Sequence, residues 1–534
     1  MSDFLLRLPN ALYRADQVKQ LDSLAITSFD RPGLELMQHA GAVVFKTIQQ
    51  RWPHTRFFRV FAGCGNNGGD GFVVAALAKQ QGINSEVILV GDTGKLSADA
   101  AAAYAKAQSA GVRFYDLKDF VDASPQQQLD VVCIDALFGT GLDRPVTGEY
   151  ALAIEQVNVS QGPVIAIDIP SGLNSDTGMP LGAAVTADVT VTFIGVKQGM
   201  LTAQGRDFCG EIVFDDLDLP SEVYSHKAAP KPSALRYDIN DATRHFLPRL
   251  SSSHKGSNGH LVIVGGDTGY GGAAIMAGEA ALRGGAGLVS VVTRSANRTA
   301  ALARCPELMI CGTEDNPQQA SSEIHQLKQV QDLLGRATAL VLGPGLGKGR
   351  WSQQLFALAV SVSRANKIPL VIDADALHLL ADKQAMLPSS QPMPWVLTPH
   401  PGEAAVLLSV DNPEIQQDRF AAAAAISELY GCICLLKGSG TLISEVSTNL
   451  PITLCSEGNP GMGTGGMGDV LSGIIGSFLA QGHDCATAAK AGAAIHGEAA
   501  DLAAERFGER GLKATDLLDF VRQLVNPTNR PNSY

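Results

Sequence analysis

A chain of 534 residues is too long for one hydrophobic core, because single cores stop growing at roughly 250–300 residues. Hydrophobic residues make up 45% and charged residues 18% of the chain, which is ordinary for a globular protein and unlike a disordered one. The formal net charge is −12 and the sequence has no basic stripe, which argues against nucleic acid or an anionic membrane as a partner. We therefore expect two large globular domains that act on small molecules.

The nine cysteines are scattered along the sequence, with no C-x-x-C pair. This pattern is typical of reduced thiols in a cytosolic protein and favours neither a disulfide framework nor a zinc site. The N-terminal stretch MSDFLLRLPNALYRADQ has no apolar run long enough for a signal peptide. No stretch approaches the ~20 uninterrupted apolar residues of a membrane helix. We expect a cytoplasmic protein.

Short apolar runs alternate with helical segments along the whole chain. This alternation is typical of βαβ units around a mostly parallel sheet and predicts an α/β fold in both halves. A connection that contains Pro220, Pro230 and Pro232 has charges but no apolar period, and it separates the halves. We place the boundary near residue 225, giving domains of residues 1–224 and 225–534. The final stretch NPTNRPNSY is expected to be disordered.

The predicted strands of the first half are Phe57–Ala62, Val87–Val90, Val131–Asp135, Val164–Asp168 and Val189–Phe193. Those of the second half are His260–Val264, Leu288–Thr293, Ala339–Leu342, Leu370–Asp373, Trp395–Thr398 and Cys432–Lys437. Helices are predicted at Phe72–Gln81, Gly148–Val159, Ala273–Gly284, Asp418–Tyr430 and Gly468–Gln481.

A glycine-rich run, G-C-G-N-N-G-G-D-G from Gly63 to Gly71, follows a predicted strand and leads into a helix. Glycines let backbone N–H groups approach an anion, and the helix N-terminus adds a partial positive charge. The run contains G-x-G-x-x-G, and Glu86 stands where a dinucleotide-binding Rossmann fold would need an acid. The consecutive Asn66 and Asn67 are more distinctive than that fingerprint. We expect a phosphate or ligand loop; a merely structural turn is the alternative.

Two further strand ends in the first half carry carboxylates. Asp135 ends a strand in VVCIDALFGTGLDRP, and Asp168 ends another in VIAIDIPSGLNSDTG. Ligands bind outside the carboxyl ends of strands in doubly wound sheets, although either aspartate could simply cap the turn that follows. Asn67, Asp135 and Ser171 are hard oxygen donors, which suit an alkali or alkaline-earth cation better than zinc.

At these residues the first half, roughly residues 10–220, resembles the NAD(P)H-hydrate epimerases. The resemblance implies a Rossmann-like three-layer domain in which Asp168 is the acid–base residue beside the hydrated nicotinamide. It implies that potassium is bound by Asn67, Asp135 and Ser171. It also implies substrate contacts from two segments: Asn66, Asn67, Gly68, Gly69 and Asp70, which contact the phosphate region, and Gly139, Thr140, Gly141, Leu142, Asp143, Arg144 and Pro145, which line the pocket.

In the second half a glycine run, N-P-G-M-G-T-G-G-M-G-D from Asn459 to Asp469, leads into an apolar helix. Such a loop can surround a phosphoryl group with backbone donors while the Asp469 carboxylate takes a proton from an attacking hydroxyl. The alternative is that Asp469 only caps the helix. No Walker lysine follows these glycines, so the pattern excludes a P-loop.

Several other predicted strand ends carry unusual loops, which indicates one cleft. Lys437-Gly438-Ser439-Gly440-Thr441 is a candidate nucleotide contact, and His400, between two prolines, is more consistent with ligand contact than with a packed core. Gly343–Gly347 and Asp373–Asp375 follow two other strands. The polar segment S-H-K-G, residues 253–256, is a candidate lid.

The second half, from about Leu235 to Arg522, resembles the ADP-dependent NAD(P)H-hydrate dehydratases, relatives of the ribokinase-like sugar kinases. The segments that carry the resemblance are S-H-K-G, G-P-G-L-G, T-P-H-P-G-E, K-G-S-G-T and G-G-M-G-D. It implies a ribokinase-like fold, with the adenine nucleotide held by Lys437, Gly438, Ser439, Gly440, Thr441 and Gly468. It implies that Ala273, Gly345 or Gly347, His400 and Asp469 contact the hydrate. The sequence departs from the family pattern at His378, where Asn is expected after D-A-D-A-L.

The resemblances imply a bifunctional enzyme that repairs hydrated nicotinamide cofactors, NADHX and NADPHX. The first half would interconvert the R and S epimers with potassium, and the second would dehydrate the S epimer with ADP and magnesium, giving AMP and phosphate. One rival is an ATP-dependent sugar or vitamin kinase with a regulatory first half. Another treats the first half as a dinucleotide-sensing module. Helices as rich in alanine as Ala273–Gly284 pack closely against other surfaces, so we expect a homo-oligomer.

Overall fold

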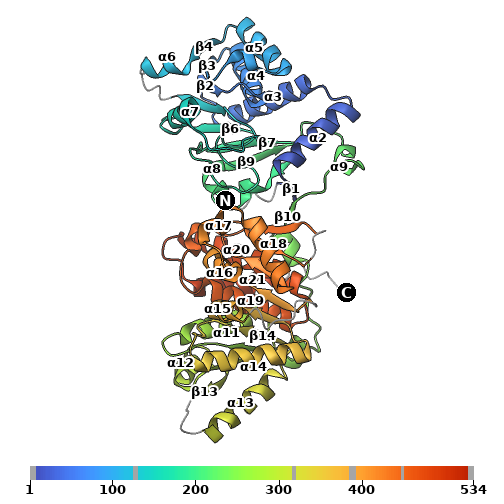
Figure 1. Cartoon of the computed structure of the whole chain (residues 1–534), viewed down its shortest axis with the longest axis vertical. Helices are drawn as coiled ribbons and strands as arrows, with labels where there is room; N and C mark the ends of the chain where they lie inside the picture. The colour runs from blue at the N-terminus through green and yellow to red at the C-terminus, as the bar shows by residue number, and fades with distance from the viewer. Residues whose placement is uncertain (1–7, 124–129, 315–319, 384–391, 447–449, 527–534) are drawn as a thin grey trace. The chain divides into compact units, whose positions relative to one another are not determined.

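The computed structural model describes residues 8–123, 130–314, 320–383, 392–446 and 450–526. The C-terminal stretch that was expected to be disordered lies, from residue 527 on, outside the described residues. The chain divides into two compact units between Leu235 and Arg236, and each unit is described by itself (Figure 1). The predicted boundary near residue 225 lies upstream of this division.

The N-terminal unit contains a seven-stranded sheet in the order β4-β3-β2-β5-β6-β7-β9, in which every neighbouring pair is parallel. Its strands are β2 (Phe57–Ala62), β3 (Asn84–Leu89), β4 (Arg113–Asp116), β5 (Val131–Ala136), β6 (Val164–Ile167), β7 (Val189–Phe193) and β9 (Glu211–Asp215). The chain runs outward from β2 to β4, then returns to β5 on the other side of β2. The sheet therefore has its topological switch point between β2 and β5, where doubly wound folds bind their ligands.

Helices cover both faces of this sheet, so the unit has three layers. Along β2, Val60 packs into one core cluster with Val44 and Phe72, from two of the helices. Its neighbour Phe61 packs into another cluster with Ile154, because successive strand side chains point to opposite faces. The helices are α2 (Ala15–Ser28), α3 (Gly33–Arg51), α4 (Asn66–Gln80), α5 (Ala98–Ser109), α6 (Leu117–Asp122), α7 (Gly148–Asn158), α8 (Gly205–Cys209) and α9 (Glu222–Ser225).

A smaller group of strands explains why the unit extends past the predicted boundary. Strand β1 (Ala11–Tyr13) pairs with the parallel strand β8 (Val196–Lys197) and with residues 234–235 of the antiparallel strand β10 (Ala234–Arg236). The proline-rich segment before β10 thus leads back to the N-terminal unit, so Ala234 and Leu235 belong to that unit.

The sheet of the C-terminal unit runs β13-β12-β11-β14-β15-β16-β17-β18-β19. Pairs from β13 to β17 are parallel, and the last two are antiparallel. The switch point lies between β11 and β14. The strands are β11 (His260–Val264), β12 (Leu288–Arg294), β13 (Met309–Thr313), β14 (Ala339–Leu342), β15 (Leu370–Ile372), β16 (Trp395–Leu397), β17 (Ile433–Leu436), β18 (Thr441–Ser444) and β19 (Ile452–Cys455).

Small residues let the central helices of this unit approach closely. A Cβ on Gly473 of α19 would lie 2.1 Å from the Ala277 carbonyl oxygen of α11, and one on Gly476 would lie 2.5 Å from Val341 Cγ2 on β14. The helices are α10 (Ile239–Thr243), α11 (Gly271–Arg283), α12 (Arg298–Arg304), α13 (Ala320–Leu334), α14 (Arg350–Asn366), α15 (Asp375–Asp382), α16 (Pro401–Leu408), α17 (Asn412–Gln417), α18 (Arg419–Tyr430), α19 (Met467–Ala480), α20 (Cys485–Phe507) and α21 (Leu518–Leu524).

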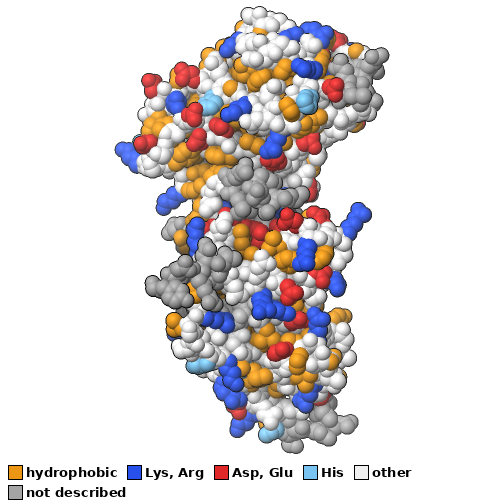
Figure 2. Space-filling model, turned by 180° about the vertical axis from the view of Figure 1, so that it is seen from behind, with side chains coloured by type: hydrophobic (Ala, Val, Ile, Leu, Met, Phe, Trp, Pro, Cys, Tyr) orange, Lys and Arg blue, Asp and Glu red, His pale blue; other side chains and the backbone are white. Residues whose placement is uncertain are grey.

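The predicted α/β architecture is confirmed in both units. Strands β2, β7, β11 and β14 coincide with their predicted ranges, and the bounds of the other predicted strands differ by one to three residues at one or both ends. Among the described helices, none is both long and apolar enough to cross a membrane. Basic and acidic side chains are interspersed on the face shown in Figure 2.

Candidate active sites

The predicted glycine loop of the N-terminal unit forms the turn between β2 and α4. Helix α4 begins at Asn66, so most of the run is already helical rather than a loop that precedes the helix. The helix was predicted to begin at Phe72, because glycines are unfavourable in helices. Here the glycines are needed for close packing: a Cβ on Gly68 would lie 2.0 Å from the Gly63 carbonyl oxygen, and one on Gly71 would lie 2.7 Å from Ala136 Cβ. The N-terminus of α4, with Asn66 exposed, stands at the switch point.

Two of the three predicted potassium ligands, Asn67 and Ser171, contact the backbone of Phe138, and the third, Asp135, contacts Ser171. Asn67, 6% exposed, donates its Nδ2 to the Phe138 carbonyl at 2.8 Å. The Ser171 hydroxyl accepts the Phe138 N–H at 2.8 Å and donates to Asp135 Oδ1 at 2.6 Å. Burial raises the pKa of Asp135 to about 6, against the opposing effect of hydrogen bonds from Ser171. The oxygens gathered here belong to the Asp135 carboxylate, the Ser171 hydroxyl and the Phe138 carbonyl, hard ligands that suit an alkali or alkaline-earth cation better than zinc.

A buried lysine, not singled out by the sequence, holds the predicted acid–base residue Asp168. Lys197 Nζ, on β8, contacts Asp168 Oδ1 and also donates to Thr192 Oγ1 at 2.9 Å and to the Phe193 carbonyl at 3.2 Å. The lysine side chain is fully buried, and that of Asp168 is 18% exposed. All three donors of the ammonium are therefore used. Asp168 has a φ of 67°, a left-handed conformation that costs of order 1 kcal/mol or more in a non-glycine residue.

Other carboxylates surround this pair. Burial, followed by the charges of Asp168 and Asp22, holds the pKa of Asp70 well above its usual range. Burial and the charge of Asp168 also raise the pKa of Asp22. Asp70 therefore ionises less readily than an exposed aspartate, beside an ion-paired Asp168. Glu86, the possible ribose-binding acid of a Rossmann fingerprint, instead pairs with Arg59 at 2.7 Å within the sheet.

The predicted substrate loop leaves the carboxyl end of β5 beside Asn67. A Cβ on Gly139 would lie 3.8 Å from Asn67 Cβ. Phe138, just before the loop, stacks on Tyr150 with ring centroids 4.3 Å apart. The residues that follow, Gly141 to Pro145, are exposed except for the half-buried Leu142. The structure thus places the loop next to the predicted cation ligands, open to a substrate.

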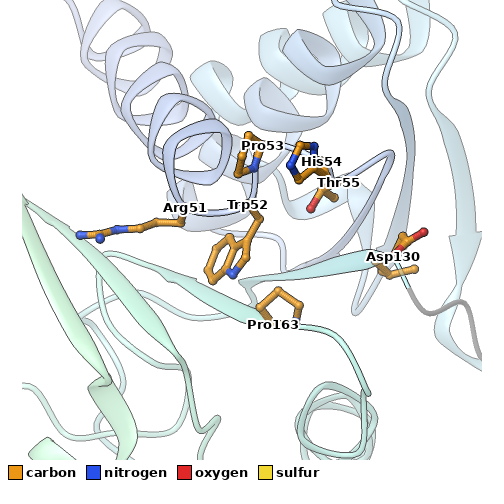
Figure 3. A pocket seen from close by; sticks show the side chains of 8 residues that line it. Arg51, Trp52, Pro53, His54, Thr55, Asp130 and Pro163 are labelled. Atoms are coloured by element: carbon orange, nitrogen blue, oxygen red, sulfur yellow. The ribbon is translucent and has the colours of Figure 1, made fainter.

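A cavity of about 310 Å³ lies away from this site. Residues at the beginnings of β2, β5 and β6 line it, namely Arg51, Trp52, Pro53, His54, Thr55, Asp130, Val131 and Pro163 (Figure 3). Because parallel strands share a direction, their beginnings and their carboxyl ends lie at opposite edges of the sheet. The cavity therefore contains none of the predicted site residues.

In the C-terminal unit, Lys437 follows β17 and contacts carboxylates that follow two other strands. Its Nζ lies 2.8 Å from Asp373 Oδ1, after β15, and 3.5 Å from Glu403 Oε2, after β16. Asp373, 2% exposed at its side chain, also accepts the Ser472 hydroxyl of α19 at 2.7 Å. A Cβ on Gly468 would lie 3.3 Å from Lys437 Nζ. The predicted nucleotide residues Lys437 and Gly468 are thus neighbours.

Asp469 is the third residue of α19, and Gly466 is the residue that precedes the helix as its cap. The alternative that Asp469 is merely the N-cap is therefore wrong. Burial, followed by the charge of Asp373, raises the pKa of Asp469 to about 7, although Lys437 opposes this. A carboxylate with a pKa near neutrality is suited to accept a proton at physiological pH.

His400 has a structural role at the beginning of α16. Its Nδ1 accepts the N–H groups of Gly402 and Glu403 at 3.0 and 3.2 Å. The Glu403 carboxylate, in turn, accepts the His400 N–H at 2.7 Å and so completes a capping box. The histidine side chain is 57% exposed, so it is not a packed core residue. A capping role fixes its ring beside Glu403, and contact with a ligand stays a prediction.

The remaining predicted hydrate contacts lie at the switch point. A Cβ on Gly345 would lie 3.1 Å from Ala273 Cβ, which brings these two positions together. The Gly347 N–H donates to Asp375 Oδ2 at 2.8 Å, and the charge of Asp375 contributes to the raised pKa of Asp469. The S-H-K-G segment is exposed, and a Cβ on Gly287 would lie 1.9 Å from the Lys255 carbonyl oxygen. Its function as a lid stays a prediction.

Sequence reasoning missed Lys197, and it missed Arg419, which contacts the Lys437–Thr441 turn from within the protein. Both are buried cations whose partners are distant in sequence, and no local motif marks them. For Lys197 the one local signal is its position at the end of an apolar segment, where a lysine is unusual without a partner.

The two sites, each at the carboxyl ends of parallel strands, define a two-domain α/β enzyme in which a Rossmann-like unit precedes a ribokinase-like unit. A family model described as NAD(P)H-hydrate dehydratase matches residues 261–523, and one described as YjeF-related protein N-terminus matches residues 33–199. The bifunctional NAD(P)H-hydrate repair enzyme Nnr of Coxiella burnetii is 41% identical, over 97% of this chain and 99% of that protein. The chain belongs to the family of bifunctional NAD(P)H-hydrate repair enzymes.

A second relative also matches over nearly its whole length, and a solved structure matches about half of this chain. The Escherichia coli protein of the same name is 39% identical, over 97% of this chain and 95% of that protein. Among solved structures, an ADP/ATP-dependent NAD(P)H-hydrate dehydratase from Bacillus subtilis, co-crystallised with ATP and Mg²⁺, is 26% identical with a TM-score of 0.45. The match covers 54% of this chain and 95% of the Bacillus subtilis chain.

Proposed function

We propose that this chain repairs hydrated nicotinamide cofactors in two steps. The N-terminal unit epimerises R- and S-NAD(P)HX, and the C-terminal unit dehydrates the S epimer to NAD(P)H with ADP, giving AMP and phosphate. Membership of the family supports both steps. The observation that carries the proposal is Asp469, a carboxyl group of pKa about 7 beside Lys437 and the strand ends predicted to contact nucleotide and hydrate.

In the N-terminal unit, Asp168 moves the proton during epimerisation. Lys197 holds its carboxylate in one orientation through Oδ1, which leaves Oδ2 for the substrate. The backbone N–H groups at the beginning of α4, with Asn66 and Asp70, bind the phosphate region. Asn67, Asp135 and Ser171 would hold potassium, which supplies positive charge for the anionic substrate. Residues Gly139 to Pro145 line the pocket.

In the C-terminal unit, Asp469 takes the proton from the nicotinamide-ring hydroxyl. The hydroxyl oxygen forms a bond to the terminal phosphorus of ADP, and the bond from that phosphorus to the AMP oxygen breaks. Phosphate then leaves the ring carbon with the bonding electron pair while a neighbouring carbon loses a proton, which restores the ring double bond. The backbone of the glycine-rich segments stabilises the transferring charge.

Magnesium enters this scheme with the nucleotide. Among the described residues no group of three His, Cys, Asp or Glu side chains is arranged to hold a metal ion, and Asp373 is engaged by Lys437 and Ser472. The nucleotide phosphates and water would supply the ligands of the metal. We further propose that the protein works in the cytoplasm, since all nine cysteines are free thiols. Assembly as a homo-oligomer stays a prediction.

The test is to incubate the full chain with mixed-epimer NADHX, ADP, Mg²⁺ and K⁺ and to follow the reduced-nicotinamide absorbance. We expect complete recovery, reduced to a partial rapid phase in Asp168→Ala and abolished in Asp469→Ala. A sensing N-terminal unit would instead give the same partial recovery with or without Asp168. No recovery with either ADP or ATP would contradict the proposal, and a stable phosphorylated sugar or vitamin product would establish the kinase alternative.

A further inference from the structure

Arg419, the first residue of α18, is almost completely enclosed by the protein. Its side chain belongs to the largest fully buried ones, with 1% exposed. Helix α18 is capped by the preceding Asp418, whose carboxylate accepts the Ala421 N–H at 2.9 Å, so Arg419 is not needed to begin the helix. Burial lowers the pKa of Arg419 to about 10, so the guanidinium stays protonated at neutral pH. Enclosing such a charge is costly unless its donors are used.

The donors of Arg419 bind one turn, Lys437–Thr441, which connects β17 to β18. Nη2 donates to the Leu436 carbonyl at 3.3 Å and to the Lys437 carbonyl at 3.1 Å. Nη1 donates to the Ser439 carbonyl and, at 3.0 Å, to the Gly440 carbonyl. The one carbonyl in between, that of Gly438, accepts the Thr441 hydroxyl at 3.2 Å. Five successive carbonyls therefore have partners within the protein.

This arrangement determines the direction of the peptide N–H groups. In a trans peptide the N–H points away from the C=O of the same unit, and the described residues contain no cis peptide. The carbonyls of Lys437, Ser439 and Gly440 face the guanidinium, so the N–H groups that follow them, on Gly438, Gly440 and Thr441, are directed away from it. The groups on Gly440 and Thr441 are adjacent, and adjacent N–H groups that point the same way in a turn form a concave site for an anion.

Glycine is required for the close approach. Gly438 has a φ of 143°, and a Cβ there would lie 2.7 Å from Arg419 Nη2. The guanidinium and the glycine thus depend on each other: the first holds the turn, and the second leaves room for it. Lysine cannot replace this arginine, because one ammonium cannot span the carbonyls that the planar fork reaches.

We propose that Arg419 is a positioning residue for nucleotide binding: its guanidinium holds the carbonyls of the Lys437–Thr441 turn inward, so that the turn presents its N–H groups to the phosphates of ADP or ATP. This inference rests on the nucleotide role proposed for the turn. Arg419 acts through the backbone and does not touch the nucleotide. It sets affinity for the nucleotide and leaves the acid–base step at Asp469 unchanged.

The test measures ADP affinity of the full chain by calorimetry, together with KM for ADP, KM for NADHX, kcat and the melting temperature. In Arg419→Lys, which keeps the charge and loses the fork, we expect the Kd and KM for ADP to rise by about tenfold or more. The kcat at saturating ADP and the KM for NADHX should stay within about twofold. The matched control is Ser427→Ala in the same helix, whose buried hydroxyl donates to the Cys432 carbonyl at 2.6 Å; it should lower stability and leave ADP affinity unchanged.

A second variant covers the case in which Arg419→Lys does not fold. Gly438→Ala disturbs the same contact from the turn, which is exposed at this residue, and should weaken ADP binding similarly. The effects of the two substitutions should be less than additive in the double variant, because they act on one contact. Unchanged ADP affinity in Arg419→Lys with a lowered melting temperature would overturn the inference and show a structural role only.

The outcomes separate this inference from the proposed function. A wild-type chain that binds ADP or ATP but does not dehydrate NADHX would contradict the proposed function, while weaker binding in Arg419→Lys would still support the inference. A wild-type chain that binds neither nucleotide would overturn both.

Discussion

Each unit has a lysine paired with carboxylate at its predicted site, but one lysine pairs with the predicted acid–base residue itself and the other with that residue's neighbours. Lys197 contacts the predicted acid–base residue Asp168 directly, and the neighbouring Asp70 is the group whose pKa is raised. Lys437 contacts Asp373 and Glu403, and the predicted base Asp469 is the group whose pKa is raised. Similar switch-point folds thus place the lysine differently: in one unit it pairs with the predicted acid–base residue, and in the other it opposes the raised pKa of that residue without pairing with it.

Replacing each lysine should therefore affect a different property of the enzyme: the epimerisation rate for Lys197 and the pH profile of dehydration for Lys437. In the N-terminal unit, Lys197→Met should slow epimerisation by about 10²-fold or more, since Asp168 loses the contact that orients it. The change also removes one partner of a buried ion pair, which costs about 3–5 kcal/mol of stability. The measurement is the slow phase of NADH recovery from mixed epimers.

Two controls separate chemistry from folding in this variant. The rapid phase, which reports the C-terminal unit of the same molecules, gives the concentration of active protein. Arg59→Met breaks another largely buried ion pair of the N-terminal unit, with Glu86, away from the predicted site residues. It should destabilise the unit and leave epimerisation unchanged. An epimerisation rate in Lys197→Met equal to that of Arg59→Met would remove the proposed distinction between the two lysines.

In the C-terminal unit, removal of the lysine should shift a pH profile. Asp469 must be ionised to accept a proton, so the dehydration rate should fall as the pH drops through about 7. Lys437 lowers the pKa of Asp469, and Lys437→Met should therefore move this acid limb up by about one pH unit, equivalent to about a tenfold loss in the ionised fraction below the midpoint. The measurement is kcat at saturating ADP from about pH 5 to pH 9.

A lysine elsewhere in the unit provides the control for the pH profile. Lys490 pairs with Glu445 at 2.6 Å, and Lys490→Met should leave the midpoint unchanged. A downward shift in Lys437→Met would contradict the assignment, because the sign follows from the loss of a neighbouring positive charge.

The positions of the strands could be predicted well from the sequence. The contacts between side chains of different strand ends could not. Runs rich in apolar and β-branched residues identify β2, β7, β11 and β14, because strands covered by helices on both faces are mostly buried. The beginning of α4 was misplaced because glycine lowers helix propensity, while the close packing that leaves no room for a Cβ at Gly68 and Gly71 comes from the tertiary structure.

The predicted site residues were found because they lie directly after strands, where local motifs mark them. Their partners lie far away in sequence: Lys197 is 29 residues from Asp168, and Ser472 is 99 residues from Asp373. Such contacts depend on strand order, which no periodicity specifies. The same holds for Arg419, which looks from sequence like a surface residue at the beginning of an alanine-rich helix.

The smallest expected effect concerns the predicted cation site, which the C-terminal unit does not share. Ser171 accepts the Phe138 N–H and donates to Asp135, so it fixes two neighbours of the proposed potassium as well as offering its own oxygen. Ser171→Ala should raise the K⁺ concentration for half-maximal epimerisation by about threefold to tenfold, because one of several oxygen ligands is lost and another is less well held. A potassium titration at constant ionic strength, with sodium as the balancing ion, measures this change.

Ser175→Ala is the matched control for the cation site. Ser175 is buried and follows Ser171 closely in the chain, but its hydroxyl donates to Asp176 at 3.2 Å. Its removal should leave the potassium dependence unchanged. Equal half-maximal K⁺ concentrations in Ser171→Ala and the wild-type chain would indicate that Asp135, Ser171 and Asn67 only stabilise the Phe138 turn, and the two units would then differ in their carboxylates alone.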